Sequence, residues 1–302
     1  MFQRNQKEDC PSGFYPRRIV CLSAETTELL YALGAGDRVV GVSGYSVRPP
    51  EARKKPKVSA FTTAKLDKIL ELRPDLVLAF SDLQADIAKE LIQKGVHVLA
   101  LNQRSLAETM GTALWIGRLL GIEGQAKKYV AMFGAEIENV KTRAAGFAKR
   151  PKVYFEEWDE PMISGIRWAG EIIEIAGGRD IFPAISLRSA ASQRVVRSQD
   201  VIQRNPDIIL ASWCGKKVPL EKIARRPGWD KIAAVKNKQI FEIKSPDILQ
   251  PGPSLLRGLR QIQEIVANYV DGHCEPVVGM RSNTVVDNGI ASRHACLRQG
   301  RG

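Results

Sequence analysis

Short apolar runs alternate with helical stretches along most of this chain. The runs RIVCLS (18–23), RVVGVS (38–43) and DLVLAF (75–80) have the length and composition of buried strands. A helical stretch accompanies each run, and the first one ends at Gly34-Ala35-Gly36, where glycine is expected to terminate a helix. Strands that alternate with helices in this way predict parallel sheets with crossover helices, an α/β fold.

The second half of the chain repeats the pattern of the first. The segment LDKILELRPDLVLAF (66–80) is echoed by SQDVIQRNPDIILAS (198–212), with a Pro-Asp pair before the strand in both. The segment TELLYALGAGDRVV (27–40) is echoed by GEIIEIAGGRDIF (170–182). Two echoes in the same order predict two similar α/β lobes.

A long helical stretch without an intervening strand runs from about residue 105 to Lys149 and stops before Pro151. We interpret the second helix of this stretch as the connection between the lobes. The predicted organisation is an N-terminal extension (1–17), a first lobe (18–123), a connecting helix (124–150), a second lobe (151–270) and a disordered tail (271–302).

Composition excludes several classes of protein. The net charge is +12, but the basic residues are dispersed, and no helix carries a basic stripe with interleaved aromatics, so nucleic acid is not an expected partner. The longest apolar runs, such as 76–80 and 208–211, are far shorter than the roughly 20 residues of a membrane-spanning helix. We therefore expect a protein that does not span a membrane. We also expect it to be a monomer.

The compartment is judged from the N-terminus and the cysteines. The first residues include no apolar core of a secretory signal, and the five scattered cysteines form no disulfide framework. Taken as written, the sequence predicts a cytoplasmic protein, or a periplasmic one if its start is misassigned.

An enzymatic site is not apparent. His97 lies in the apolar run VHVLAL, where we expect a core histidine, and the other two histidines fall in the tail. Phosphate-binding and nucleophile motifs are absent from the sequence. The cluster Glu156, Glu157, Asp159 and Glu160 is interpreted as a solvated acidic loop.

Metal binding is not predicted either. His273, Cys274, His294 and Cys296 lie in the tail, but their spacing matches no standard zinc finger.

Aromatic residues occur where predicted strands end. They are Tyr45, Phe61 and Phe80 in the first half, and Trp158 and Trp213 in the second. In open α/β sheets, ligands bind beyond the carboxyl ends of the strands. Aromatic side chains there provide flat, rigid and partly apolar walls. We therefore predict a ligand site that both lobes line.

The segments 18–61 and 66–80 resemble the first lobe of substrate-binding proteins of iron-siderophore, haem and cobalamin ABC importers. SGIRWAGEIIEIAGGRDIF (164–182) and RSQDVIQRNPDIILAS (197–212) resemble the second lobe. The cobalamin-binding members are the most similar, because a tyrosine in VSGYS is followed by paired prolines.

The resemblance implies two Rossmann-like lobes joined by one rigid helix, with a ligand cleft between them and little hinge closure. It implies ligand contacts from Ala24, Tyr45, Phe61 and Phe80, and from Trp158 or Met162 in the second lobe.

This chain also departs from the cobalamin-binding pattern. Gln193-Arg194 stands where those members tend to have an aromatic residue. Asp247 and Gln250, in the late cleft loop SPDILQPGP, replace a more usual arginine contact, and we expect both to line the cleft.

Family members dock on their permease through an acidic residue on each lobe. Asp67 matches the first of these positions. The second position falls at Gln199, so we expect the neighbouring Asp200 to serve there.

The resulting hypothesis is non-catalytic binding of cobalamin or a related corrinoid, for delivery to an ABC importer. The protein would need no cofactor of its own, and none of its histidines would coordinate cobalt. The first alternative is a haem or ferric-siderophore binding protein. A second alternative, from another class, is a tetrapyrrole-modifying enzyme.

Overall fold

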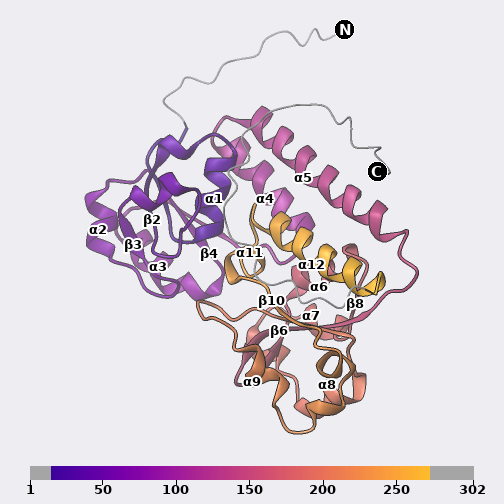
Figure 1. Ribbon diagram of the computed structural model, residues 1–302. Coiled ribbons are helices and arrows are strands. Elements are labelled where there is room, and N and C mark those ends of the chain that lie inside the picture. The colour runs from indigo at the N-terminus through magenta and orange to yellow at the C-terminus, as the bar shows by residue number, and fades with distance from the viewer. Residues whose placement is uncertain (1–14, 273–302) are drawn as a thin grey trace, which may run out of the picture.

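The computed structural model describes residues 15–272, which form two α/β lobes (Figure 1). The first lobe contains one parallel sheet with the strand order β3-β2-β1-β4-β5. Its strands are β1 (Ile19–Cys21), β2 (Val39–Ser43), β3 (Lys57–Ser59), β4 (Leu76–Phe80) and β5 (Val98–Leu101). The α/β fold expected from the alternating runs is thereby confirmed.

Helices cover both faces of this sheet, which explains its uninterrupted apolar strands. They are α1 (Ala24–Ala32), α2 (Leu66–Glu71) and α3 (Ala85–Gln93). All residues of β1 and β4 are buried. Gly34 has a φ of 75° just after α1, so the glycine ends that helix in a conformation that other residues rarely adopt.

The second lobe contains the sheet β10-β9-β6-β7, in which β8 also pairs with β6. Its strands are β6 (Lys152–Asp159), β7 (Met162–Ser164), β8 (Arg179–Asp180), β9 (Ile208–Ala211) and β10 (Ile240–Glu242). Strands β8, β9 and β10 pair in parallel, but β7 turns back and pairs antiparallel to β6. This hairpin has no counterpart in the first sheet.

The second lobe contains seven α-helices within the described residues, of which the first and the last are the longest. They are α6 (Arg167–Ile175), α7 (Pro183–Ser186), α8 (Ser198–Arg204), α9 (Leu220–Ala224), α10 (Ala233–Lys236), α11 (Ser245–Ile248) and α12 (Leu255–Val270). The predicted repeat is visible here, because α8 leads into β9 beside β6 just as α2 leads into β4 beside β1.

Two helices, α4 (Leu106–Leu119) and α5 (Glu123–Ala144), connect the lobes. They approach closely where Gly117 faces Ala126: a Cβ on this glycine would lie 2.3 Å from the Cβ of Ala126. Helix α12 returns along α5 and α6 (Figure 1). One cluster of buried apolar residues includes Leu78 of the first sheet and Phe155 of the second, so the lobes share a continuous core.

The structure corrects the interpretation of His97. This residue is exposed and lies just before β5, not inside an apolar strand. The sequence misled because β5 lies at the edge of the sheet, where even a residue whose backbone pairs with β4, as the His97 carbonyl does with Val77 N–H, can leave its side chain exposed. The predicted disordered tail lies outside the described residues, except for Asp271 and Gly272.

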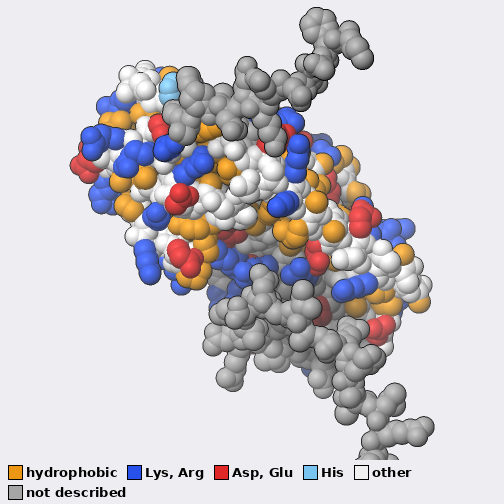
Figure 2. All heavy atoms as spheres, turned by 90° about the horizontal axis from the view of Figure 1, so that it is seen from above, with side chains coloured by type: hydrophobic (Ala, Val, Ile, Leu, Met, Phe, Trp, Pro, Cys, Tyr) orange, Lys and Arg blue, Asp and Glu red, His pale blue; other side chains and the backbone are white. Residues whose placement is uncertain are grey.

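No helix within residues 15–272 is both long and apolar enough to cross a membrane. The same part of the chain contains no cluster of three or more potential metal ligands of the His, Cys, Asp or Glu type. Figure 2 shows one face on which Lys and Arg side chains are spread among acidic and apolar ones.

Candidate functional site between the lobes

Two of the predicted aromatic residues are exposed at the carboxyl ends of strands in the first lobe. Tyr45 follows β2 and is 50% exposed, and Phe61 follows β3 and is 38% exposed. The backbone N–H of Gly44 donates to the carbonyl of Ser59 at 2.8 Å, which holds the two strand ends together. Large aromatic side chains are therefore presented to solvent at the edge where a parallel sheet binds ligands.

The other two predicted residues of the first lobe are buried. Ala24 begins α1 and is 3% exposed. Phe80, at the end of β4, is 5% exposed, and the guanidinium of Arg104 lies 5.4 Å from the centre of its ring. The ring of Phe80 is thus covered by a cation, not open as expected.

Of the predicted acidic loop, only Glu160 is exposed in the turn after β6. Glu156, Glu157 and Asp159 lie within β6, and each is paired with a basic side chain. The N···O distances are 2.5 Å for Arg226–Glu156, 2.5 Å for Arg194–Glu157 and 2.6 Å for Lys222–Asp159. The sequence concealed this arrangement because the three bases lie far along the chain from the acids.

Trp213 belongs to the core of the second lobe, which corrects its expected role as an open cleft wall. It is 4% exposed and packs in a cluster with Tyr154 and Trp229. Its indole Nε1–H donates to the carboxylate of Glu156 at 3.2 Å. A strand-end position alone did not reveal that α9 and the loop before it cover the indole.

Trp158 and Met162 lie near the turn of the β6–β7 hairpin, where Trp158 pairs with Ile163 and Met162 with Asp159, and both are partly buried. The ammonium of Lys216 lies 4.3 Å from the centre of the Trp158 ring. A cation over an indole face is favourable, and this pair combines an aromatic surface with a positive charge. Of the predicted tryptophans, Trp158 is the one that retains accessible surface.

Asp247 links the lobes. It is 4% exposed in α11, and its carboxylate lies 2.7 Å from Arg48 Nη2, which comes from the loop after β2. Arg48 also donates to Ser254 Oγ at 2.9 Å, and Ser254 in turn donates to Glu28 of α1. Gln250 is half-buried in the turn after α11. We call Arg48, Asp247, Ser254 and Glu28 the interlobe latch.

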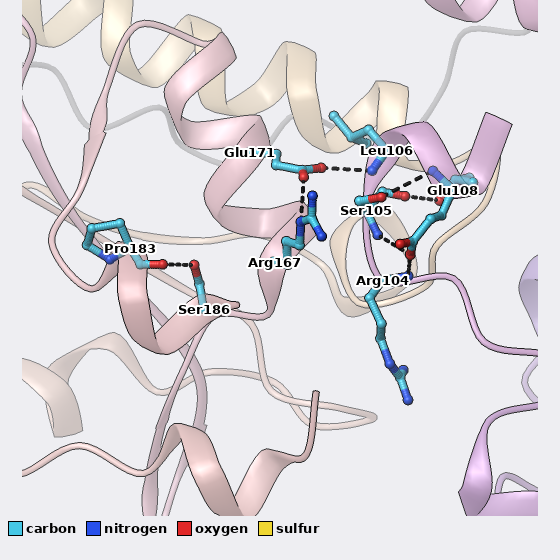
Figure 3. A network of polar contacts seen from close by, with 9 residues as sticks. Arg104, Ser105, Leu106, Glu108, Arg167, Glu171, Pro183 and Ser186 are labelled. Atoms are coloured by element: carbon cyan, nitrogen blue, oxygen red, sulfur yellow. Dashed lines mark hydrogen bonds and ion pairs between the residues drawn. The ribbon is translucent and has the colours of Figure 1, made fainter. Parts of the chain in front are cut away.

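A second link joins the start of α4 to α6. Glu171 accepts from the backbone N–H of Leu106 at 2.8 Å and from Arg167 Nε at 2.9 Å (Figure 3). Ser105 caps α4, and its hydroxyl accepts from Glu108 N while the Glu108 carboxylate accepts from Ser105 N. The end of the first sheet is therefore held firmly against the second lobe.

Helix α1 closely approaches the loop before α12. A Cβ on Gly252 would lie 2.8 Å from the Cβ of Glu25, so glycine is needed for this approach. Burial, with a smaller contribution from the charge of neighbouring Glu28, raises the pKa of the Glu25 carboxyl to about 7. The side-chain oxygen Oε1 of Glu25 has no hydrogen-bond partner within residues 15–272.

Sequence reasoning missed two arginines between the lobes. Arg194, noted only as a departure from the family pattern, is 2% exposed and binds both Glu157 and the carbonyl of Ser164. Arg104 follows β5, which is the same strand-end position that singled out the aromatics. Applying the strand-end criterion to basic residues would have found it.

The two predicted docking residues lie on different lobes. Asp67 is exposed in the first turn of α2. Asp200, in the first turn of α8, is paired with Arg197 through two hydrogen bonds of 2.8 and 2.9 Å.

Comparison with known proteins identifies the family. The model of the family described as periplasmic binding protein matches residues 19–246, about three quarters of the chain. The chain belongs to this family. Family membership agrees with the two α/β lobes and with the resemblance to ABC-importer substrate-binding proteins.

Three similar proteins cover most of the chain. One is an uncharacterised ABC transporter substrate-binding lipoprotein, YvrC, of Bacillus subtilis, 28% identical over 83% of this chain and 80% of that protein. Another is a vitamin B12-binding protein of Vibrio parahaemolyticus, 25% identical over 82% of this chain and 88% of that protein. The third is a crystal structure of a possible iron-binding, periplasmic solute-binding protein of Staphylococcus epidermidis. It is 28% identical, has a TM-score of 0.73, and is matched over 83% of this chain and 98% of that one.

The names of these proteins do not support the cytoplasmic location expected from the sequence. They describe a lipoprotein and a periplasmic protein. Within residues 15–272, Cys21 and Cys214 are both free thiols, so the cysteines themselves do not decide the compartment.

Proposed function

We propose that this protein binds cobalamin or a related corrinoid between its lobes, without catalysis, and delivers it to an ABC importer. The observation that carries the proposal is the set of accessible aromatic side chains at strand ends of both lobes: Tyr45, Phe61 and Trp158. Aromatic surface on this scale is costly to leave in water and suits a broad, largely apolar ligand.

The choice of a corrinoid is supported by the similarity to a protein named as vitamin B12-binding. The first alternative is an iron chelate, haem or a ferric siderophore, which is favoured by the similarity to a possible iron-binding protein. A tetrapyrrole-modifying enzyme is a third possibility, on analogy alone.

The ligand's metal is expected to receive no histidine from residues 15–272. His97, the histidine in that range, is exposed at the amino end of β5, whereas the aromatic residues lie at the carboxyl ends of their strands. A corrinoid bound here would keep its own lower ligand and be held by shape and aromatic contact. Haem would need another protein ligand, such as Tyr45.

The location and partner follow from the same proposal. A protein of this kind would work outside the cytoplasmic membrane and meet a permease there, as expected of ABC-importer substrate-binding proteins. Asp67 and Asp200 remain the proposed docking residues. Asp67 is the more accessible of the two, because Asp200 already forms an ion pair with Arg197.

Thermal unfolding with a panel of ligands tests the proposal. Cyanocobalamin, haem and ferrichrome are each added in excess to the purified chain, because a ligand that binds the native state raises its stability. We expect cyanocobalamin to raise Tm most and to be recovered chemically unchanged. A rise with haem or ferrichrome but none with cyanocobalamin would favour the alternative ligands, and conversion of any of them would indicate an enzyme.

A further inference from the structure

Arg104 has an unusual environment for a largely buried arginine. Its side chain is 19% exposed, and its Nε atom is buried without a hydrogen-bond partner in the described part of the chain. The nearest ion pair is loose: Nη2 lies 3.7 Å from Asp82, a residue whose side chain is 82% exposed. The charge of Arg104 is therefore weakly compensated.

Three other arginines near the interface between the lobes or in the second lobe are firmly paired. Each has a carboxylate oxygen within about 2.7 Å: Arg48 with Asp247, Arg194 with Glu157, and Arg226 with Glu156. An arginine that lacks such a pair loses hydration on burial and gains little in return. Arg194 also has a buried Nε without a partner, so Arg104 differs from these neighbours in having no carboxylate close to its guanidinium.

The position of Arg104 places it at the proposed site. It follows the carboxyl end of β5, and its guanidinium lies over the ring of Phe80 at the end of β4. Burial lowers its pKa, and the charges of Arg194 and Glu157 in the second lobe also act on it. In Figure 3 the Arg104 side chain extends away from the capped start of α4 and from the bonded groups drawn there.

We propose that Arg104 binds an anionic group of the ligand, and that in a corrinoid this group is the phosphodiester of the nucleotide loop. The inference rests on the proposed function, since it assumes that the ligand lies between the lobes. It adds the requirement that the ligand carries an anionic group. The aromatic side chains do not impose this requirement, because they contact apolar surface.

Local charge and geometry both favour an anion. Arg194 and Glu157 neutralise each other, so the acidic groups left to oppose Arg104 are the exposed Asp82 and Glu108, whose carboxylate accepts from the Arg104 backbone N–H. The guanidinium carbon of Arg104 lies 5.4 Å from the centre of the Phe80 ring, an apolar neighbour that competes little for the N–H donors. Guanidinium groups match phosphate oxygens through paired, charge-assisted hydrogen bonds.

The test compares two corrinoids that differ in this group. Cyanocobalamin carries the phosphodiester, and dicyanocobinamide lacks the whole nucleotide loop. We would measure the affinity of both for the parent chain and for Arg104→Gln, which removes the charge and keeps much of the length. Arg118→Gln is the control, because Arg118 lies at the far end of α4 and its side chain is 63% exposed.

We expect Arg104→Gln to weaken cyanocobalamin binding by about tenfold or more, on the scale of one hydrogen bond to a charged group. The same substitution should change the affinity for dicyanocobinamide by less than about twofold. Added salt should weaken cyanocobalamin binding in the parent more than in Arg104→Gln, because screening acts on the charge that the variant lacks. Arg118→Gln should match the parent.

Two results would overturn the inference while leaving the proposed function intact. One is an equal loss of affinity for both corrinoids, with an unchanged melting temperature, which would mean that Arg104 contacts the ring. The other is an Arg104→Gln variant that binds cyanocobalamin like the parent. If the parent binds neither corrinoid, the proposed function and this inference both fail.

Discussion

Tyr45 and Trp213 show how the same sequence pattern leads to different environments. Both follow the end of a strand, and the sequence therefore predicted the same role for both. Tyr45 is half exposed, whereas Trp213 is 4% exposed and hydrogen-bonded to Glu156. The pattern identifies which edge of the sheet a residue occupies. Whether other elements then cover the side chain, as they cover the indole of Trp213, depends on tertiary packing.

This difference gives a prediction for two alanine variants. Tyr45→Ala should reduce ligand affinity by on the order of 1–3 kcal/mol, the scale for losing an aromatic anchor, and barely change stability. Trp213→Ala should lower the free energy of unfolding by about 3–5 kcal/mol, the cost of deleting a large core side chain. Calorimetric binding and urea unfolding measure the two quantities. If Tyr45→Ala instead lowered stability and Trp213→Ala lowered affinity, Tyr45 would be structural and Trp213 would line the site.

Glu25 gives a pH dependence of stability. Its folded pKa of about 7 lies above the ordinary glutamate value of 4.5, because burial disfavours the charged form. Between these two pH values the unfolded chain has released the proton and the folded chain retains it. Stability should therefore fall as pH rises from about 4.5 to 7, by on the order of 3 kcal/mol from this group.

Urea unfolding at pH 5 and at pH 8 measures this loss. Asp180 acts in the same direction at lower pH, since burial raises its pKa to about 6. Glu25→Gln should remain more stable than the parent at pH 8 and lose less stability between the two pH values. An identical loss in parent and variant would show that Glu25 does not titrate in this range.

At the level of elements, the sequence predicted most of what local pattern can encode. The strands of the first sheet, the helices α4 and α5 and the repeated helix–strand pair were all visible as periodicity. The antiparallel β7 was not, because three residues carry too little pattern to reveal their direction. The acids of β6 were also misread, since alternation cannot show that Arg194, Lys222 and Arg226 approach from elsewhere.

Glycines in the connecting helices allow a matched test of their packing. Gly117→Ala should destabilise the protein by about 1–3 kcal/mol, because the added methyl group would overlap Ala126 across the α4–α5 contact. Gly134 lies within α5, and a Cβ added there would have no neighbouring atom within 4 Å, so Gly134→Ala should stabilise by roughly 0.5–1 kcal/mol. Equal effects in urea unfolding would contradict the close approach of the two helices.

At the level of the whole molecule, the two lobes are held together by more than the connecting helices. The interlobe latch, the Glu171 link and a shared apolar core all join them. The limited hinge closure that the family resemblance implies stays a prediction. Sequence alone could not predict the latch, because Arg48 and Asp247 lie in opposite halves of the chain and nothing local pairs them.

Arg48→Met tests the latch. Removing the guanidinium leaves Glu28 and Asp247 buried with no cation between them, so the free energy of unfolding should fall by about 3–5 kcal/mol. Arg188→Met is the control, because Arg188 is exposed after α7, and it should change stability by less than about 0.5 kcal/mol. Similar small effects in both variants would show that the latch contributes little.

The central claim is that one corrinoid binds between the lobes through the exposed aromatic side chains. Calorimetric titration of cyanocobalamin into the parent chain, and into the Tyr45→Ala/Trp158→Ala double variant, tests it most directly. The account predicts one site per chain in the parent and a loss of affinity of at least about tenfold in the variant. An absence of binding heat in the parent together with no rise in Tm, or equal affinity in parent and variant, would contradict it.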